Sequence, residues 1–339
     1  MKENKLLALG IPTYGRPDFA IRAIKNAVAM NIYDQIIISS NSYEKQIDDT
    51  IRDLGVKEIT YYQQDSNVGM SLNYYEVIRL CECKYLHIVS DEDLINEKNT
   101  KKLYSILNDD EEDISVVILS VRDLEGGLYR DASWQKNRTL RNICGDSGHF
   151  GSSIIRVKDW KEETFKLMYK YCTRNGDAYP TAAAAILSYS TGGELLYFPP
   201  HLLEMGKLHK VSEMSGNRIY GFEARLNQFV TMFNLIDNKS LESTFKVYMY
   251  VFYFFSHHAL RSAMIKYPDD DIIAISRNVL SNSCLTFKER AVTYLVIAAH
   301  YLYRVYYFSR KAVRIIFEKL RIDQTYYRFR ANCVKLFSK

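Results

Sequence analysis

The residues best suited to chemistry stand together at Ser90-Asp91-Glu92-Asp93, directly after the apolar run Tyr85–Val89. If that run is a β-strand that continues through the motif, Asp91 and Asp93 project in one direction and Glu92 in the other, because strand side chains alternate. Two carboxylates at the carboxyl edge of an open α/β sheet suit a divalent cation that holds a diphosphate. The alternative is a strand followed by an acidic turn, so the surrounding elements must decide.

The chain around this motif alternates between strands and helices. The expected strands are Leu6–Ile11, Gln35–Ser39, Glu58–Tyr62, Lys84–Val89 and Ile114–Val121. The expected helices run from Asp18 to about Met30, from Met70 to Leu80 and from Glu97 to Leu107. A further helix, between the second and third strands, is expected to end at Leu54. Strands that alternate with helices of this length predict a doubly wound, mostly parallel sheet with helices on both faces.

The regular alternation ends after Val121. Arg122–Arg141 is typical of a hairpin or an irregular insertion, and Ile154-Ile155 and Glu194–Phe198 are strand-like. Helices are expected over Trp160–Tyr171 and from Gly176-Asp177, and from Phe222 the periodicity is helical almost to the end. We therefore expect an α/β domain at 1–218 and a C-terminal helical region at 219–339.

Composition narrows the class of protein. Of 339 residues, 47% are hydrophobic and 25% charged, which is ordinary for a soluble globular protein. The six cysteines show no zinc or disulfide spacing and the first residues show no secretory signal, so we expect a cytoplasmic protein. Residues 288–339 hold 12 Lys/Arg against 3 Asp/Glu while the whole chain is only +5, which argues against a nucleic-acid partner.

Two loops ahead of the acidic motif suit a nucleotide. Pro12-Thr13-Tyr14 follows the first strand, where nucleotides bind in doubly wound sheets. Asn67-Val68-Gly69 opens a helix, whose first N–H groups favour a phosphate. Taken singly, the first is also a plain turn and the second a plain helix cap. Their order before the carboxylates is what one mechanism can use.

In this order, three blocks resemble the family 2 glycosyltransferases with the GT-A fold, of the bacterial surface-polysaccharide type. The blocks are Leu9–Arg16, Asn67-Val68-Gly69 with Leu72-Asn73, and the acidic motif at 91–93; the resemblance covers roughly residues 5–215. It implies a Mn²⁺ or Mg²⁺ on the donor diphosphate, held by Asp93 and by Asp91, which alternatively contacts the ribose. The donor-binding residues that it implies are Pro12, Thr13, Tyr14, Arg16, Ser40, Asn41, Asn67, Gly69, Asn73 and Asp91.

The resemblance also implies a catalytic base and a third metal ligand. An inverting transfer needs a base for the acceptor hydroxyl, and Asp177, 84 residues after Asp93, matches the position of the family's acidic motif at a helix start. Asp146 is the reserve candidate, and a helix N-cap is the alternative role for Asp177. His209, in a segment like the family's His-x-x-Ser element, would reach the metal or a phosphate; a polar loop residue is its alternative role.

One departure from the family concerns the nucleotide base. The second strand ends in Ser39-Ser40-Asn41, where relatives place an Asp that accepts the uracil imide proton. Ser40 or Asn41 would then contribute one hydrogen bond without a charge. UDP stays the expected nucleotide.

The basic C-terminal third suits a membrane surface. Ala291–Tyr303 is a 13-residue apolar run, shorter than the roughly 20 residues that a spanning helix needs. Arg304 and Lys311, and then Arg314, Arg321 and Arg328, recur at seven-residue spacing. A basic amphipathic helix at 291–335 fits the membrane interface. Packing on the core with a solvated basic face, or forming a homodimer, are the alternatives.

The whole pattern predicts a metal-dependent, inverting hexosyl- or related transferase. It would move a sugar from a nucleotide sugar, UDP-linked, to a saccharide or lipid-linked saccharide in bacterial polysaccharide, O-antigen or capsule biosynthesis, at the inner face of the cell membrane. Two rival functions stay open. One is a nucleotidyl- or phosphotransferase on a similar sheet, and the other is a non-catalytic scaffold that binds a sugar or nucleotide.

Overall fold

The structure is a computed structural model of the chain. It describes residues 5–109, 113–122, 128–130, 150–175, 180–206, 221–227, 230, 264–265, 269–283 and 286–319. The chain divides into two compact units: Met1–Ile219 with Asn227–Tyr250, and Tyr220–Leu226 with Val251–Lys339. Each unit is described by itself below.

The first unit opens with four parallel strands joined by helices, as the alternation in the sequence predicts. The elements are β1 (Leu7–Thr13), α1 (Pro17–Met30), β2 (Gln35–Ser40), α2 (Lys45–Leu54), β3 (Ile59–Gln63), α3 (Met70–Arg79) and β4 (Tyr85–Ile88). Every residue of β1, β2 and β4 is buried, as expected for strands covered on both faces. α1 begins at Pro17, one residue before the predicted start at Asp18, because the fixed φ of proline suits a first helical position.

The second part of this unit is less regular. Its elements are β5 (Leu94–Ile95), α4 (Glu97–Asn108), β6 (Ile114–Arg122), β7 (Leu128–Arg130), β8 (Ser153–Arg156), α6 (Glu162–Asn175), α7 (Pro180–Tyr189) and β9 (Glu194–Glu204). β7 pairs antiparallel with β6, so the hairpin expected after Val121 is present in the described residues. β9 continues six residues beyond the predicted end at Phe198.

All these strands form one sheet. In the described residues its order is β3-β2-β1-β4-β8-β6-β9-β5, with β7 beside β6. The pairings show that β1, β2, β3, β4, β6 and β9 run in one direction, while β5, β7 and β8 run against them. The predicted α/β class with a mostly parallel sheet is confirmed.

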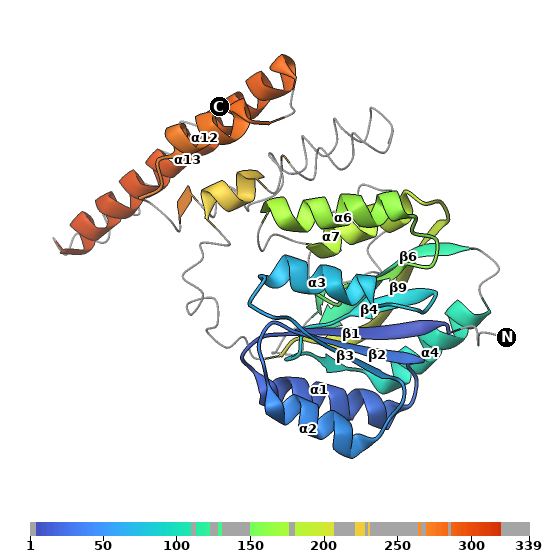
Figure 1. Ribbon diagram of the computed structural model, residues 1–339. Coiled ribbons are helices and arrows are strands. Elements are labelled where there is room, and N and C mark those ends of the chain that lie inside the picture. The colour runs from blue at the N-terminus through green and yellow to red at the C-terminus, as the bar shows by residue number, and fades with distance from the viewer. Residues whose placement is uncertain are drawn as a thin grey trace. The chain divides into compact units, whose positions relative to one another are not determined.

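Helices cover both faces of the sheet (Figure 1). α1, α2 and α4 share one apolar core with the sheet, through side chains such as Ile24, Ile47 and Leu103. α3 and α7 lie against the opposite face, and α6 packs on these two helices. Burial on both faces fixes the strand positions, and therefore fixes the loops at the carboxyl edge.

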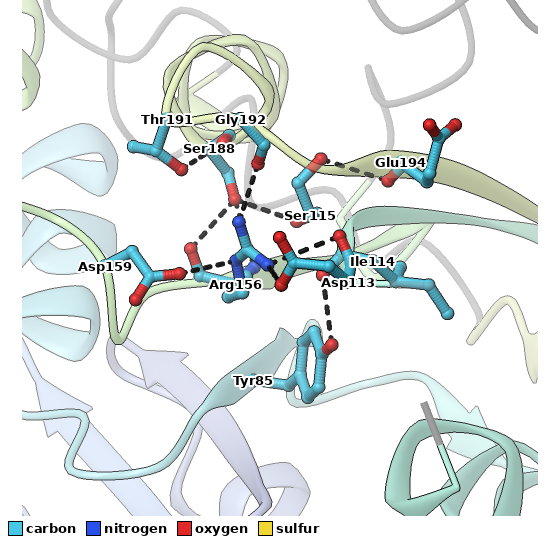
Figure 2. Close-up of polar contacts among 10 residues, drawn as sticks. All are labelled: Tyr85, Asp113, Ile114, Ser115, Arg156, Asp159, Ser188, Thr191, Gly192 and Glu194. Atoms are coloured by element: carbon cyan, nitrogen blue, oxygen red, sulfur yellow. Dashed lines mark hydrogen bonds and ion pairs between the residues drawn. The ribbon is translucent and has the colours of Figure 1, made fainter. Parts of the chain in front are cut away.

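The antiparallel strand β8 is held by a buried arginine (Figure 2). The Arg156 side chain is 3% exposed; it forms ion pairs with Asp113 and, at 2.8 Å, with Asp159, and donates to the carbonyl of Gly192 at 2.6 Å. The hydroxyl of Ser188 accepts from the Arg156 N–H at 3.0 Å. These contacts join β8 to the start of β6 and to the end of α7, at the edge opposite the carboxyl ends of the parallel strands.

The Pro199-Pro200 pair lies inside β9 and explains an irregularity there. The register jumps from Leu119↔Phe198 to Ser120↔His201, so the two prolines have no partner residue in β6. Proline lacks the N–H that a ladder needs, which is why it is tolerated at such a bulge. The strand resumes beyond the bulge and carries the chain on to Gly206.

The second unit is helical in its described residues. They include α12 (Ile272–Ser281) and the 33-residue α13 (Phe287–Lys319). Asp271 caps α12, because its carboxylate accepts from the N–H groups of Ile273 and Ala274. Within the described residues, neither helix is long and apolar enough to cross a membrane.

Candidate active site

The acidic motif and the first loop meet where the strand order reverses. The chain passes outward through β1, β2 and β3, and then returns to place β4 on the other side of β1. Pairing of β1 with β4 ends at Gly10↔Ile88, so the two strands separate at their carboxyl ends. Open α/β sheets bind ligands in the crevice at such a switch point.

The backbone at Ser90–Asp93 is a turn. β4 ends at Ile88, and the Asp93 N–H donates to the carbonyl of Ser90 at 3.1 Å. The expectation of a continuing strand, with Asp91 and Asp93 on one side and Glu92 on the other, is therefore wrong. The three carboxylates take directions set by the turn and by their partners.

Asp91 is buried and its two oxygens are both occupied. Oδ2 accepts from the Thr13 hydroxyl at 2.7 Å, and Oδ1 pairs with Nη2 of Arg16 at 2.5 Å. Burial raises the pKa of Asp91, while the Arg16 charge and the Thr13 hydrogen bond act in the opposite direction. The carboxylate thus locks the loop after β1 to the loop after β4.

Arg16 also engages the residue that the sequence assigned no role. Its Nη1 pairs with Oε2 of Glu92 at 2.6 Å, so one guanidinium bridges the neighbouring carboxylates Asp91 and Glu92. The Glu92 carbonyl accepts from Nη2 of Arg22 at 2.7 Å. Glu92 and Arg22 were missed because their contacts depend on the turn, and no spacing in the sequence indicates them.

Asp93 differs from Asp91 because one of its carboxylate oxygens has no hydrogen-bond partner among the described residues. It is 6% exposed; Oδ1 accepts from the Gly206 N–H at 2.9 Å, and Oδ2 is buried with no hydrogen-bond partner in the part of the chain described. Burial, with the charges of Glu92 and Asp91, raises the pKa of Asp93 to about 7. A buried polar atom without a partner calls for a ligand or an ion.

Gly206 brings the end of β9 against the acidic turn. A Cβ at this position would lie 2.1 Å from the carbonyl oxygen of Glu92, so only glycine permits the approach. Gly206 does not stand out in the sequence. A glycine after a strand is common. The one feature of the sequence that could have indicated Gly206 is its position just before the segment that contains His209.

The remaining residues that were predicted to bind the sugar donor mostly form hydrogen bonds that hold the loops in place. Asn73 donates to the carbonyl of Thr13 at 3.1 Å and accepts from the Ser39 hydroxyl at 2.6 Å. Asn41 donates through its side chain to the carbonyl of Gly69 at 3.0 Å. Ser40 donates to the carbonyl of Ser42 at 2.7 Å. The groups expected to read a base therefore already have partners inside the protein.

The turn before α3 contains Asn67 and Gly69 as the sequence suggests, but the N–H of Gly69 is not available for a phosphate. Gly69 has φ +84°, which favours glycine, and its N–H donates to Oδ1 of Asn67 at 2.9 Å. That N–H is therefore already bonded. Pro12 is buried within β1, and Tyr14, in the loop that follows β1, is 46% exposed at the carboxyl edge of the sheet.

A carboxylate not singled out from the sequence lies beside this edge. The Ser42 hydroxyl accepts from the Gly15 N–H at 3.2 Å and donates to Oε1 of Glu44 at 2.7 Å. This relay ties the loop after β1 to the loop after β2.

Asp146, Asp177 and His209 lie outside the described residues. Among those described, no group of three or more His, Cys, Asp or Glu side chains is arranged to hold a metal ion. A divalent cation here would take Asp93 as its ligand from the acidic turn and complete its shell from phosphate and water. Mg²⁺ commonly binds in this way, through one or two carboxylates plus substrate phosphates.

Comparisons with known proteins agree with this geometry. Residues 9–172 match the model of Glycosyl transferase family 2. The chain is 32% identical over 97 residues to the putative colanic acid biosynthesis glycosyl transferase WcaA of Escherichia coli K12, a match that covers 27% of this chain and spans only 34% of that protein.

The fold is also similar to solved structures. TarS 1–349 of S. aureus, in complex with UDP-GlcNAc, aligns with a TM-score of 0.56 at 12% identity, over 87% of this chain and 80% of that one. The structure of S. aureus TarS aligns over 88% of this chain and 54% of that one, again with a TM-score of 0.56 at 12% identity. The matched segment, the order of its motifs and the fold together identify residues 9–172 as a glycosyl transferase family 2 domain on a GT-A-like fold.

Proposed function

We propose that the chain is a metal-dependent, inverting glycosyltransferase with residues 1–218 as its catalytic domain. The observation that carries the proposal is the junction at the switch point. Thr13 and Arg16 hold Asp91 there, while the adjacent Asp93 keeps a buried, unpartnered oxygen. The donor would be a nucleotide sugar, and the acceptor a saccharide or lipid-linked saccharide.

The two aspartates have different roles in this proposal. Asp93 would hold Mn²⁺ or Mg²⁺ through Oδ2, and the cation would neutralise charge that develops on the departing diphosphate. Asp91 has both oxygens occupied, so it positions the Thr13 loop and meets the ribose only if Thr13 or Arg16 gives way. His209 stays a predicted third ligand.

Asp177 stays the proposed base. The acceptor hydroxyl would pass its proton to this carboxylate while its oxygen bonds to the anomeric carbon and the bond to the nucleoside diphosphate breaks. The described part of α7 begins at Pro180, three residues after Asp177. Asp177→Asn should lower turnover at least about 100-fold with donor affinity preserved, and unchanged turnover would assign the base to Asp146 or elsewhere.

UDP is the proposed nucleotide, supported by the UDP-GlcNAc complex of the similar TarS fold. Base recognition would differ from the family pattern, since Ser40 and Asn41 already have internal partners. Glu44 is the carboxylate that reaches this edge through Ser42. A weaker preference for uracil than an aspartate would give is the expected consequence.

The biological setting is also a proposal. The similarity to a protein named for colanic acid biosynthesis supports a role in bacterial surface polysaccharide assembly. An acceptor on a lipid carrier would place the enzyme in the cytoplasm, at the inner face of the membrane.

A donor screen tests the proposal. Nucleotide sugars would be added to the full chain with and without Mn²⁺, and thermal shift and product release measured. We expect one nucleotide sugar to raise the melting temperature only with the metal, and transfer to release nucleoside diphosphate. Asp93→Ala should abolish both the rise in melting temperature and the release of nucleoside diphosphate. Without metal, this variant should still melt cooperatively, which would show that it is folded.

The same assay separates the rival functions. Release of pyrophosphate would indicate a nucleotidyltransferase. Tight donor binding without turnover over a panel of acceptors would indicate a binding scaffold. Turnover of Asp93→Ala near the unmutated level would overturn the metal role.

A further inference from the structure

α13 exposes an unusual amount of apolar surface. Of the 14 large hydrophobic side chains that are exposed in the described residues, eight lie on this helix between Phe287 and Tyr307. The most exposed are Phe287 at 83%, Leu295 at 71% and Leu302 at 69%. Scattered exposed hydrophobics are normal, but a contiguous exposed patch marks a binding surface.

Most of these exposed side chains fall on one side of the helix, and Tyr307 is the one that lies outside it. At about 100° per residue, Tyr294, Leu295, Tyr301, Leu302, Val305 and Tyr306 occupy a sector of roughly 140°. From residue 291 to 309 the sector contains only Ala, Leu, Val, Tyr and Ser, so we define these residues as the apolar face of α13. Packing within the protein uses a different side, where Thr293 is fully buried and Ile297 is 5% exposed.

Charge indicates what covers the apolar face. The segment from residue 288 to 339 carries a net charge of +9. Pairing with a second copy would bring two such segments together, which like-charge repulsion opposes. A bilayer rich in anionic lipid instead attracts them, with about 1 kcal/mol for each Lys or Arg near the surface.

The residue types agree with a membrane surface. Tyrosine is enriched at membrane–water interfaces because its ring is apolar and its hydroxyl is polar. Three of the six exposed residues named for the face are tyrosines. A helix with an apolar face and basic residues elsewhere lies in the interface plane.

We propose that the apolar face of α13 inserts into the headgroup region of an anionic membrane, with the basic C-terminal segment held against the lipid phosphates. Lipid contact through this face does not require that the chain transfer a sugar. Loss of the proposed activity would leave it standing, and loss of lipid binding would leave the activity standing.

Vesicle flotation of the full chain tests the proposal. We expect the protein to float with phosphatidylcholine vesicles that contain 30% phosphatidylglycerol, to stay at the bottom with phosphatidylcholine alone, and to dissociate as NaCl rises from 50 to 500 mM. Leu302→Glu should lower the partition coefficient at least about tenfold, since it removes a Leu that the bilayer would bury and adds a charge of the wrong sign.

The matched control is Ile106→Glu on α4, which also places a glutamate at an exposed hydrophobic position. Its flotation should equal that of the unmutated chain. Leu302→Ala provides a milder variant, with an intermediate loss, and circular dichroism checks that each variant is folded. Two results would overturn the proposal: equal flotation of Leu302→Glu and the unmutated chain, or a dimer in solution that Leu302→Glu dissociates while the unmutated chain ignores anionic vesicles.

Discussion

At the scale of single residues, Asp93 combines a proposed role in metal binding with a cost to the stability of the fold. Its carboxylate is buried, accepts a hydrogen bond from Gly206 and lies beside two further carboxylates. A buried charge with an unsatisfied oxygen destabilises the folded state unless a counter-charge arrives. A bound divalent cation would supply that charge.

Asp93→Asn should therefore stabilise the metal-free protein while it weakens metal binding. We expect the free energy of unfolding in EDTA at pH 8 to rise by about 1–3 kcal/mol, because the variant removes a buried charge. Urea denaturation measures this change. Asp48→Asn on the exposed face of α2 is the control, with an expected change within about 0.5 kcal/mol. A lower stability for Asp93→Asn would contradict the argument.

His87, in the middle of β4, is a second buried titratable group with the opposite effect on stability. Its Nε2 lies 3.1 Å from the carbonyl of Gly151, and burial lowers its pKa to about 4. In the unfolded chain the pKa is near 6.5, so between pH 6.5 and 4 only the unfolded state takes up the proton. The contribution of His87 to the free energy of unfolding is therefore fully present above pH 6.5, and it is lost as the pH falls toward 4.

The loss should approach about 3 kcal/mol at pH 4, at 1.36 kcal/mol for each unit of pKa difference. His87→Gln keeps a donor for Gly151 but does not titrate. Denaturation at several pH values should therefore show a smaller fall in stability for His87→Gln than for the unmutated chain. Asp93 titrates in a similar range, and its contribution cancels in this comparison. Parallel pH profiles for the two proteins would exclude the effect.

At the scale of elements, Arg156 is the residue that anchors the inserted strand β8. Its buried guanidinium connects the carbonyl of Gly192 with Asp113 and Asp159, whose own side chains are largely exposed. Arg156→Met should cost about 2–4 kcal/mol, chiefly through the lost charge-assisted hydrogen bond to Gly192.

Equilibrium unfolding in urea checks this cost. Arg52→Met on α2 is the matched control, because its ion pairs are at the surface and contribute less than about 1 kcal/mol. Similar losses for the two variants would show that the buried cluster has no special role. A loss confined to Arg156→Met would support it.

The sequence predicts the elements of the parallel half well, because helices and strands with strong apolar periodicity reveal themselves locally. β1 to β4 and β6 lie where the alternation places them. The direction of β8 and the two-residue β5 were not predicted, because such short strands are defined by their partners. The sequence placed Thr13, Arg16 and Asp91 in one candidate site, and the structure brings these three side chains into contact. The geometry of the site was not predicted, because the turn at Ser90–Asp93 and the approach of Gly206 are tertiary effects.

At the scale of the whole molecule, the two units carry separable proposals. The candidate active site combines Thr13, Asp91 and Gly206, three positions far apart in the chain, and all lie in the first unit. The apolar face of α13 lies in the second. Ligands of one unit should therefore stabilise that unit locally.

Hydrogen exchange on the full chain can resolve the two effects. A nucleoside diphosphate with Mn²⁺ at about 100 times its Kd should stabilise the bound state by about 2.7 kcal/mol, and therefore slow exchange at 10–16, 88–94 and 203–206. Anionic vesicles should slow exchange along α13 and leave those three segments unchanged. Because the stabilisation requires a ligand contact or a coupled opening, protection of α13 by the nucleotide would show that the units open as one and that their binding is linked.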